Sequence, residues 1–146
     1  MNRIKLTEAQ IAQARRRVAS ERISSLAPDE IFVFGSNLAG MHGGGAARAA
    51  VDHFGAVWGQ GEGLQGQSYA IPTMQGGVST IRPYVQEFIR FAEKHPEMTF
   101  YVTRIGCGIA GFRDEEIARL FAKALPVSNI YLPASFWKVI NYMYNR

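Results

Sequence analysis

Short runs of β-branched and aromatic residues alternate along this chain with longer segments of helical periodicity. The runs at 31–34, 68–72, 99–105 and 130–132 are predicted to be strands. Helices are expected between and after them, at 45–54, 80–95, 114–125 and 136–144. Strands joined through helices run parallel with right-handed crossovers. The alternation therefore predicts an α/β fold: a three-layer α/β/α domain with a mainly parallel or mixed central sheet and helices on both faces.

Size and composition indicate one globular domain over 1–146. The chain has 146 residues, of which 47% are hydrophobic and 19% charged, so it can bury a core of ordinary size. Its apolar runs are short, and its first residues lack the apolar segment of a secretory signal. A cytoplasmic protein without membrane association is expected. Cys107 is the single cysteine, so no internal disulfide and no cysteine-clustered metal site is expected, and no cofactor is predicted.

The basic charge is concentrated near the start of the chain. Residues 1–26 carry six Lys or Arg against two Glu, whereas residues 27–146 carry ten of each sign. Thr7 and Gln10 have the spacing of a capping box, which predicts a helix that packs on the domain. Ile11, Ala14 and Val18 would face inward, and the residues 15–17 would form a solvated basic face. Nucleic-acid binding through this arginine triplet is an alternative that so small a patch does not favour.

The stretch FGSNLAGMHGGGAARAA, residues 34–50, leaves a predicted strand and enters an alanine-rich helix through consecutive glycines. Glycines at a helix start leave no Cβ to block a ligand, and the first-turn N–H groups of the helix have no partner within it. Together with the helix dipole they form an anion site that needs no basic side chain. Neither a Walker A loop nor the spacing of a dinucleotide fingerprint is present. A tight turn with close packing is the alternative interpretation.

A second glycine loop, RIGCGIAGF at 104–112, also leaves a strand and enters a helix. The carboxyl ends of parallel strands meet at one edge of a sheet, where ligands bind in α/β folds. The segment that begins at Thr73 follows a third strand to the same edge. The two glycine loops are therefore predicted to enclose a diphosphate from both sides.

These motifs resemble those of the macrodomain family, the ADP-ribose-binding module. The similar pieces are IFVFGSNLAGMHGGGAARAA, SYAIPT and YVTRIGCGIAGFRDEEIARLF, which together span most of 28–135. RIGCG is similar to the branch that contains terminal ADP-ribose glycohydrolases, and FGSNLAG with IGCGIAG resembles bacterial and phage macrodomain-like proteins. The resemblance implies that Asn37 lies near the distal ribose and that Phe136 or Trp137 covers the adenine. The residues expected to bind the ligand are Gly35, Ser36, Asn37, Gly43, Gly44, Gly45, Ala46, Thr73, Gly106, Cys107, Gly108, Ile109, Ala110, Gly111, Phe112 and Phe136.

The same resemblance bears on catalysis. One hydrolytic macrodomain class carries an acidic residue just after its glycine run, where this chain has Ala46 and Ala47. The RIGCG branch carries an aspartate where this chain has Ala110, and its lysine nucleophile has no clear counterpart. Binding of ADP-ribose or a related nucleotide diphosphate derivative is therefore the leading hypothesis. Hydrolytic removal of ADP-ribose from a macromolecule, with Asn37 and His42 as candidate catalytic residues, is an alternative, as is sequestration of an NAD-derived signalling nucleotide.

The sequence leaves two interpretations open for each of two further features. Cys107 lies between glycines near a helix start, where its pKa could fall, yet a small buried residue fits the position as well. The segment WGQGEGLQG, 58–66, is either a mobile lid or a fixed loop.

Overall fold

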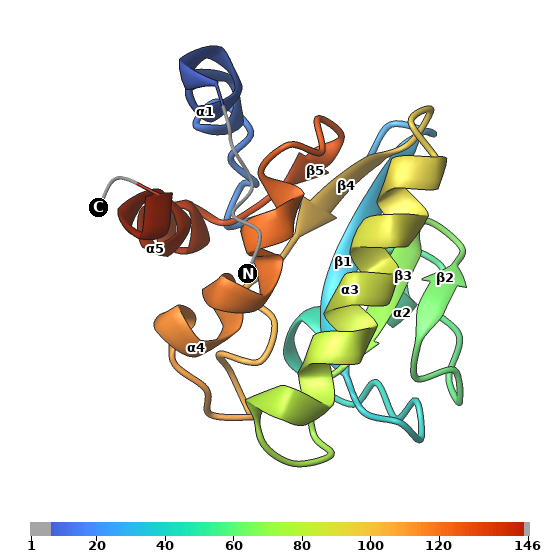
Figure 1. Ribbon diagram of the computed structural model, residues 1–146. Helices are drawn as coiled ribbons and strands as arrows, with labels where there is room; N and C mark the ends of the chain where they lie inside the picture. Colours follow the sequence, from blue (N-terminus) through green and yellow to red (C-terminus); the bar gives the residue numbers. More distant parts are fainter. Residues whose placement is uncertain (1–6, 145–146) are drawn as a thin grey trace.

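The computed structural model describes residues 7–144 and contains one five-stranded sheet (Figure 1). Its strands, in the spatial order β2-β3-β1-β4-β5, are β1 (Glu30–Ser36), β2 (Gly63–Gln65), β3 (Ser68–Pro72), β4 (Thr99–Val102) and β5 (Ile130–Tyr131). β1 pairs in parallel with β3 and β4, and β5 continues the parallel arrangement, whereas β2 is antiparallel to β3. The predicted α/β fold with a mainly parallel sheet is confirmed.

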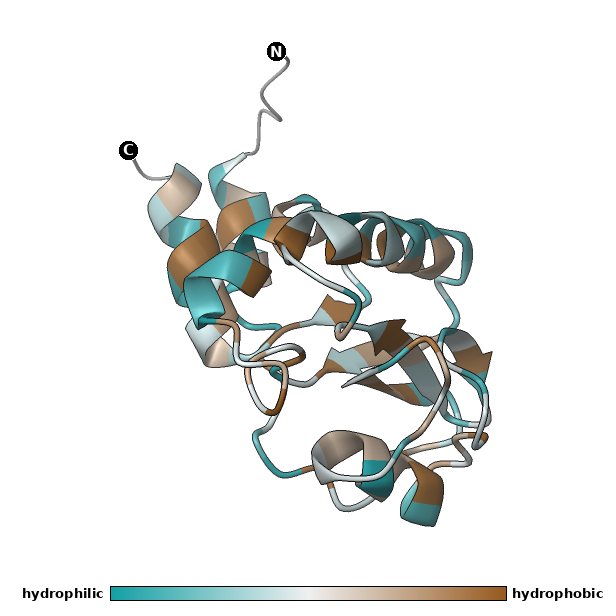
Figure 2. Ribbon diagram, turned by 90° about the horizontal axis from the view of Figure 1, so that it is seen from below, coloured by the Kyte–Doolittle hydropathy of each residue, from teal (hydrophilic) through white to brown (hydrophobic). Residues whose placement is uncertain are grey.

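Helices cover both faces of this sheet, as Figure 2 shows in side view. One face carries α2 (Gly45–His53), which packs Ala47, Ala50 and Phe54 against Phe32 and Phe34 of β1. The other face carries the remaining helical elements: α3 (Val78–Lys94), α4 (Asp114–Ala118), the 3-10 helix η1 (Arg119–Ala124) and α5 (Ala134–Tyr144). The larger core lies on this second face, because α3, α4, η1 and α5 all bury their apolar residues there.

Most element boundaries agree with the sequence pattern. Residues 68–72 form a strand as predicted, and α2 and α3 lie within two residues of their expected ends. The single helix expected over 114–125 is instead α4 followed by η1, with a change from α to 3-10 geometry at Arg119. β2 is a strand that the sequence did not predict, because its three residues, Gly-Leu-Gln, carry no β-branched or aromatic side chain.

The N-terminal segment departs most from its prediction. The capping box of Thr7 and Gln10 is present, but α1 (Glu8–Ala14) ends before Val18, so the expected inward helical face at that position is wrong. Val18 forms a parallel bridge with Leu132 and extends the sheet beyond β5. The basic residues Arg3 and Lys5 lie outside the described residues.

Within this segment, the position of Arg17 differs most from its prediction. It was expected on a solvated face, yet it is 2% exposed. Its guanidinium donates to the carbonyl oxygens of Ala124 (3.0 Å), Leu125 (2.9 Å) and Ile130 (2.9 Å), and it lies over the ring of Trp137. Arg17 therefore joins the N-terminal segment to the last turn of η1 and to β5. Its neighbours Arg15 and Arg16 are exposed, as predicted.

No helix within residues 7–144 is long and apolar enough to cross a membrane.

Candidate functional site: a cavity between two glycine loops

A cavity of about 570 Å³ lies where the carboxyl ends of β1, β3 and β4 meet. This volume lies within the range of small-molecule sites, about 300–1,000 Å³. Its position follows from the parallel pairing, which brings three strand-to-helix loops to the same edge. The residues that line it are Gly35, Ser36, Asn37, Met41, Gly43, Gly44, Gly45, Ala46, Ala47, Thr73, Met74, Thr103, Arg104, Ile105, Gly106, Gly108, Ile109 and Ala110.

The first wall is the entry into α2. The backbone turns at Gly45, whose φ of 57° favours glycine, and the helix cap Gly44 makes no side-chain hydrogen bond. Within residues 7–144, no oxygen accepts a hydrogen bond from the N–H groups of 43–47. A Cβ built on Gly43 or Gly45 would meet no atom within 4 Å. Packing therefore does not require these glycines, and their effect is to leave the helix N-terminus open to the cavity.

The opposite wall is the second glycine loop. Gly106 has a φ of 73°, and a Cβ there would lie 2.9 Å from Ile117 Cδ1, so this glycine is required for packing against α4. Gly108 differs, because a Cβ there would meet open space. The N–H groups of 108–110 likewise have no acceptor among the described residues. This wall therefore presents a second run of unpaired donors.

The two walls are close to each other at two levels. At the base, a Cβ on Gly35 would lie 3.3 Å from the Cβ of Ile105. At the rim, a Cβ on Gly44 would lie 3.7 Å from the Cδ1 of Ile109, whose side chain is 83% exposed. The cavity is thus narrow, and the mouth is partly covered by an apolar side chain.

Polar side chains in the cavity are few and mostly used by the fold. The amide of Asn37 donates to the carbonyl oxygen of Met41 (2.9 Å) and accepts from its N–H (2.8 Å), which closes the 37–41 loop. Thr73 Oγ1 donates to the carbonyl oxygen of Ser36, and Thr103 Oγ1 to that of Val33. An amide has two donors and two acceptor lone pairs, so Asn37 retains capacity for a ligand hydroxyl.

Arg104 is the charged side chain among the lining residues. Its guanidinium donates to Asp114 Oδ1 from both Nε (3.1 Å) and a terminal nitrogen (2.9 Å), and this raises its pKa further. The pKa of Asp114 is lowered in turn: its burial opposes the shift, but hydrogen bonds from Arg104 and Cys107 outweigh it. The pair orients Arg104 at the edge of the cavity.

His42 lies beneath the cavity and does not line it. The ring is fully buried, with Phe34 packed edge-on at 5.1 Å between ring centroids. Nε2 is 2.9 Å from the carbonyl oxygen of Val57, which only accepts, so Nε2 carries a proton and Nδ1 is bonded to the Ser36 hydroxyl at 2.7 Å. His42 supports the loop from below, and its buried ring is out of reach of a ligand.

Four of the expected ligand-binding residues also lie outside the lining: Cys107, Gly111, Phe112 and Phe136. Phe136 is fully buried and packs on Phe121, while Trp137 donates its indole N–H to the carbonyl oxygen of Arg17 (2.6 Å). Phe136 and Trp137 therefore belong to the core, because α5 is amphipathic and packs on η1. Neither ring can cover an adenine in this arrangement.

Cys107 is half-buried, and its environment stabilises the protonated thiol. Burial, followed by its hydrogen bond to Asp114, raises the pKa of the thiol to about 12. The thiol therefore stays protonated at neutral pH and is a poor nucleophile.

The structure adds lining residues that the sequence interpretation did not include: Met41, Ala47, Met74, Thr103 and Ile105. Met41 and Met74 are more than half exposed. In the sequence, the methionines within the loops after β1 and β3 were the available signal for this apolar surface.

The segment 58–66 packs against the 37–41 loop. Gly59 N–H donates to the carbonyl oxygen of Gly40 (2.8 Å), and a Cβ on Gly61 would lie 2.3 Å from the carbonyl oxygen of Asn37. This backbone contact braces the 37–41 loop from outside. The segment does not line the cavity, and these contacts favour the fixed-loop interpretation over the lid.

The lining residues include no aspartate, glutamate, histidine or lysine. Within residues 7–144 there is also no group of three or more His, Cys, Asp or Glu side chains that could hold a metal ion. The site therefore offers backbone donors, apolar surface and one arginine.

A second cavity, of about 500 Å³, adjoins the first. The two share Thr103 and Arg104, and the second is also lined by Glu21, Asp114 and Ser135. The shared residues make a continuous surface from the glycine loops toward the start of α5.

The chain matches no protein-family model, no curated protein and no solved structure.

Proposed function

We propose that this protein binds ADP-ribose or a related nucleotide diphosphate derivative in the cavity between its two glycine loops. One observation carries the proposal: two separate runs of backbone N–H groups without an acceptor among the described residues, at 43–47 and 108–110, belong to residues that line one cavity. An anion with several acceptor oxygens satisfies both runs at once. A diphosphate has this chemistry and a length suited to two facing loops.

The electrostatics of the cavity agree with such a ligand. The N-terminus of α2 supplies a positive partial charge, and nothing acidic lines the cavity to oppose an anion. Arg104 lies at the edge of the cavity, where Asp114 orients it, and three of its five N–H donors remain for an anion. Phosphate is therefore bound mainly by backbone donors, which explains how a domain with balanced charge can accommodate it.

The rest of the cavity suits the sugar and base of a nucleotide. Met41, Met74 and Ile109 form exposed apolar surface beside the glycine loops. Asn37 has remaining hydrogen-bond capacity for a ribose hydroxyl. The adjoining cavity, reached past Thr103 and Arg104, is the place for the nucleoside end of the ligand. The resemblance of the glycine loops to those of macrodomains supports the same ligand class.

Binding is favoured over hydrolysis. The cavity has no lining carboxylate or histidine to act as a general acid or base, and the buried ring of His42 is committed to Val57 and Ser36. Asn37 can orient a water molecule but cannot remove a proton from it.

Isothermal titration calorimetry with ADP-ribose, ADP and AMP tests the proposal. We expect saturable one-to-one binding of ADP-ribose, and AMP at least about 10-fold weaker because it lacks the second phosphate; this ratio corresponds to about 1.4 kcal/mol. ADP is expected between them. Equal affinities for AMP and ADP-ribose would exclude the diphosphate as the main recognised group, and absence of binding by all three would refute the proposal.

A further inference from the structure

A groove between α3 and η1 carries a concentration of positive charge that the nucleotide cavity does not use. The groove has a volume of about 410 Å³. Arg82 and Arg90 line it from α3, and Arg119 and Lys123 line it from η1, against the single acidic residue Glu93. It shares no residue with the cavity between the glycine loops.

The four groove cations are a large share of the basic residues of the domain, and among the described residues they lack the carboxylate partners that Arg48, Arg104 and Arg113 have. Residues 27–146 contain ten Lys or Arg, so four of the ten lie in this one groove. Arg48, Arg104 and Arg113 pair with nearby carboxylates elsewhere on the surface. Within residues 7–144, none of the four groove cations makes an ion pair or a side-chain hydrogen bond. Their charge is therefore available to an external anion.

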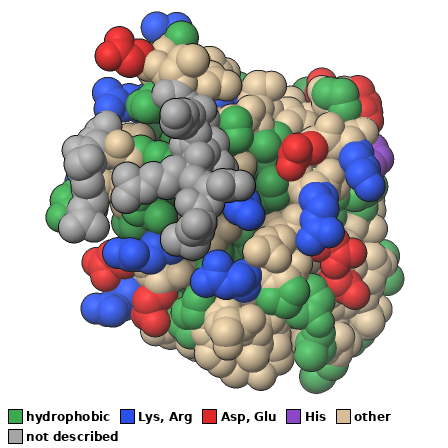
Figure 3. Space-filling model, viewed as in Figure 1, with side chains coloured by type: hydrophobic (Ala, Val, Ile, Leu, Met, Phe, Trp, Pro, Cys, Tyr) green, Lys and Arg blue, Asp and Glu red, His purple; other side chains and the backbone are tan. Residues whose placement is uncertain are grey.

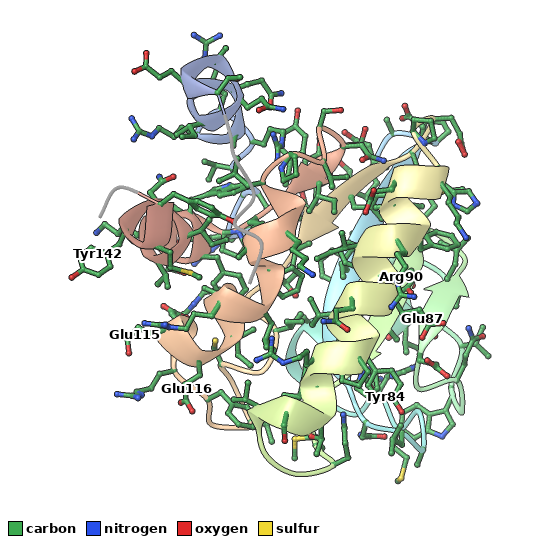
Figure 4. All side chains as sticks on the ribbon, viewed as in Figure 1. Tyr84, Glu87, Arg90, Glu115, Glu116 and Tyr142 are labelled. Atoms are coloured by element: carbon green, nitrogen blue, oxygen red, sulfur yellow. The ribbon has the colours of Figure 1, made fainter. Side chains whose placement is uncertain are left out.

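The cations are arranged in two rows on one face of the molecule. Figure 4 labels Arg90 on the outward side of α3, one turn beyond Glu87, and Figure 3 shows Lys and Arg side chains on this face. Arg82, Gln86 and Arg90 follow one another at four-residue spacing, so Arg82 and Arg90 are separated by about 12 Å along the helix axis. Arg119 and Lys123 have the same spacing on η1. The η1 pair is separated by about 8 Å along its axis, because a 3-10 helix rises about 2.0 Å per residue. Four cations spread over this groove suit an extended anion that carries several charged groups.

From this arrangement we infer that the α3–η1 groove binds the phosphate backbone of a nucleic acid. Each strand of a B-form duplex carries one phosphate about every 3.4 Å along the duplex axis, so the distance between Arg82 and Arg90 corresponds to about three to four phosphates when α3 lies along that axis. The apolar residues at the base of the groove, Ile89 and Leu120, are both buried. An acidic protein segment would find no apolar pocket there to anchor its side chains, whereas a phosphate backbone needs none. The groove also offers no aromatic side chain for base stacking, so binding is independent of base sequence.

Fluorescence anisotropy with a labelled 20-base-pair DNA duplex of mixed sequence tests this inference. Four phosphate contacts predict that the logarithm of the association constant falls with the logarithm of salt concentration with a slope of about −3.6. We expect Arg82→Ala/Arg90→Ala to weaken binding at least about 5-fold at low salt and to reduce the magnitude of this slope by about 1.8. Arg119→Ala/Lys123→Ala provides an independent pair from the other row, with the same expectation.

Arg15→Ala/Arg16→Ala is the matched control. It removes two exposed arginines and leaves the same net charge as the α3 variant, so it separates a groove effect from an effect of total charge. We expect this control to bind DNA within 2-fold of the original chain. Equal losses in the control and groove variants would overturn the inference, as would no loss in either groove pair or no binding by the unmodified chain at 50 mM salt. Displacement of the DNA by polyglutamate at the same charge concentration would overturn it in favour of an acidic protein partner.

Discussion

Replacing Arg17 with methionine is expected to lower the free energy of unfolding by about 3–5 kcal/mol. Methionine fills much of the same volume but leaves the carbonyl oxygens of Ala124, Leu125 and Ile130 without the donors they have now. A buried polar group that loses its partner costs about 1–3 kcal/mol. Against a total stability of about 5–15 kcal/mol, this is a large fraction. Thermal denaturation followed by circular dichroism should show a melting temperature lower by about 10–20 °C.

Arg16→Met is the control for this prediction, because Arg16 is the adjacent residue and is exposed. It should change the unfolding free energy by no more than about 0.5 kcal/mol. If both variants melt like the original chain, Arg17 does not join the N-terminal segment to the rest of the domain in the way its hydrogen bonds indicate.

Gly44→Glu should weaken ADP-ribose binding by at least about 100-fold, equivalent to about 2.7 kcal/mol, without unfolding the protein. The backbone at Gly44 is extended, with φ −153°, so any residue can adopt it. A side chain there enters the cavity beside Ile109, occupies the space for the diphosphate and places a like charge against it. Calorimetry gives the affinity, and thermal denaturation of the same sample checks that the fold is retained.

Gly77→Glu is the matched control for the glycine loop. Gly77 also precedes a helix, α3, and its Cβ position is also open, but it does not line the cavity. We expect its affinity for ADP-ribose to lie within 2-fold of the original. Comparable losses in both variants would mean that added negative charge, and not occupation of the cavity, weakens binding.

The sequence was a good guide to the parts of this protein that depend on local pattern. Alternating strands and helices predicted the three-layer fold, and parallel strands brought the loops after β1, β3 and β4 to one edge. The glycines at 43–45 and at 106 and 108 were expected at the same site, and the structure places them around one cavity. Glycine-rich strand-to-helix loops are identifiable because their conformation is encoded within a few residues.

The features that the sequence did not predict depend on contacts between distant residues. Arg17 lies in an arginine triplet and nothing local distinguishes it from Arg16, since its carbonyl partners are more than 100 positions away. His42 is next to the glycines in sequence, yet the 57–65 segment packs over it and buries it. The aromatic residues at the start of α5 face the core because η1 packs against them. The spacing of residues in the sequence does not predict this contact.

Amide NMR spectra recorded during titration with ADP-ribose are the sharpest test of diphosphate binding between the two glycine loops, because the proposed donors are themselves backbone N–H groups. The largest shifts are expected at 43–47 and 108–110 together, with smaller ones around Ser135 in the adjoining cavity. Both glycine loops must respond at the same ligand concentration, since one diphosphate satisfies both. Saturating ADP-ribose that leaves the amide signals of both loops unchanged, or that shifts only residues outside the two cavities, would contradict this binding mode.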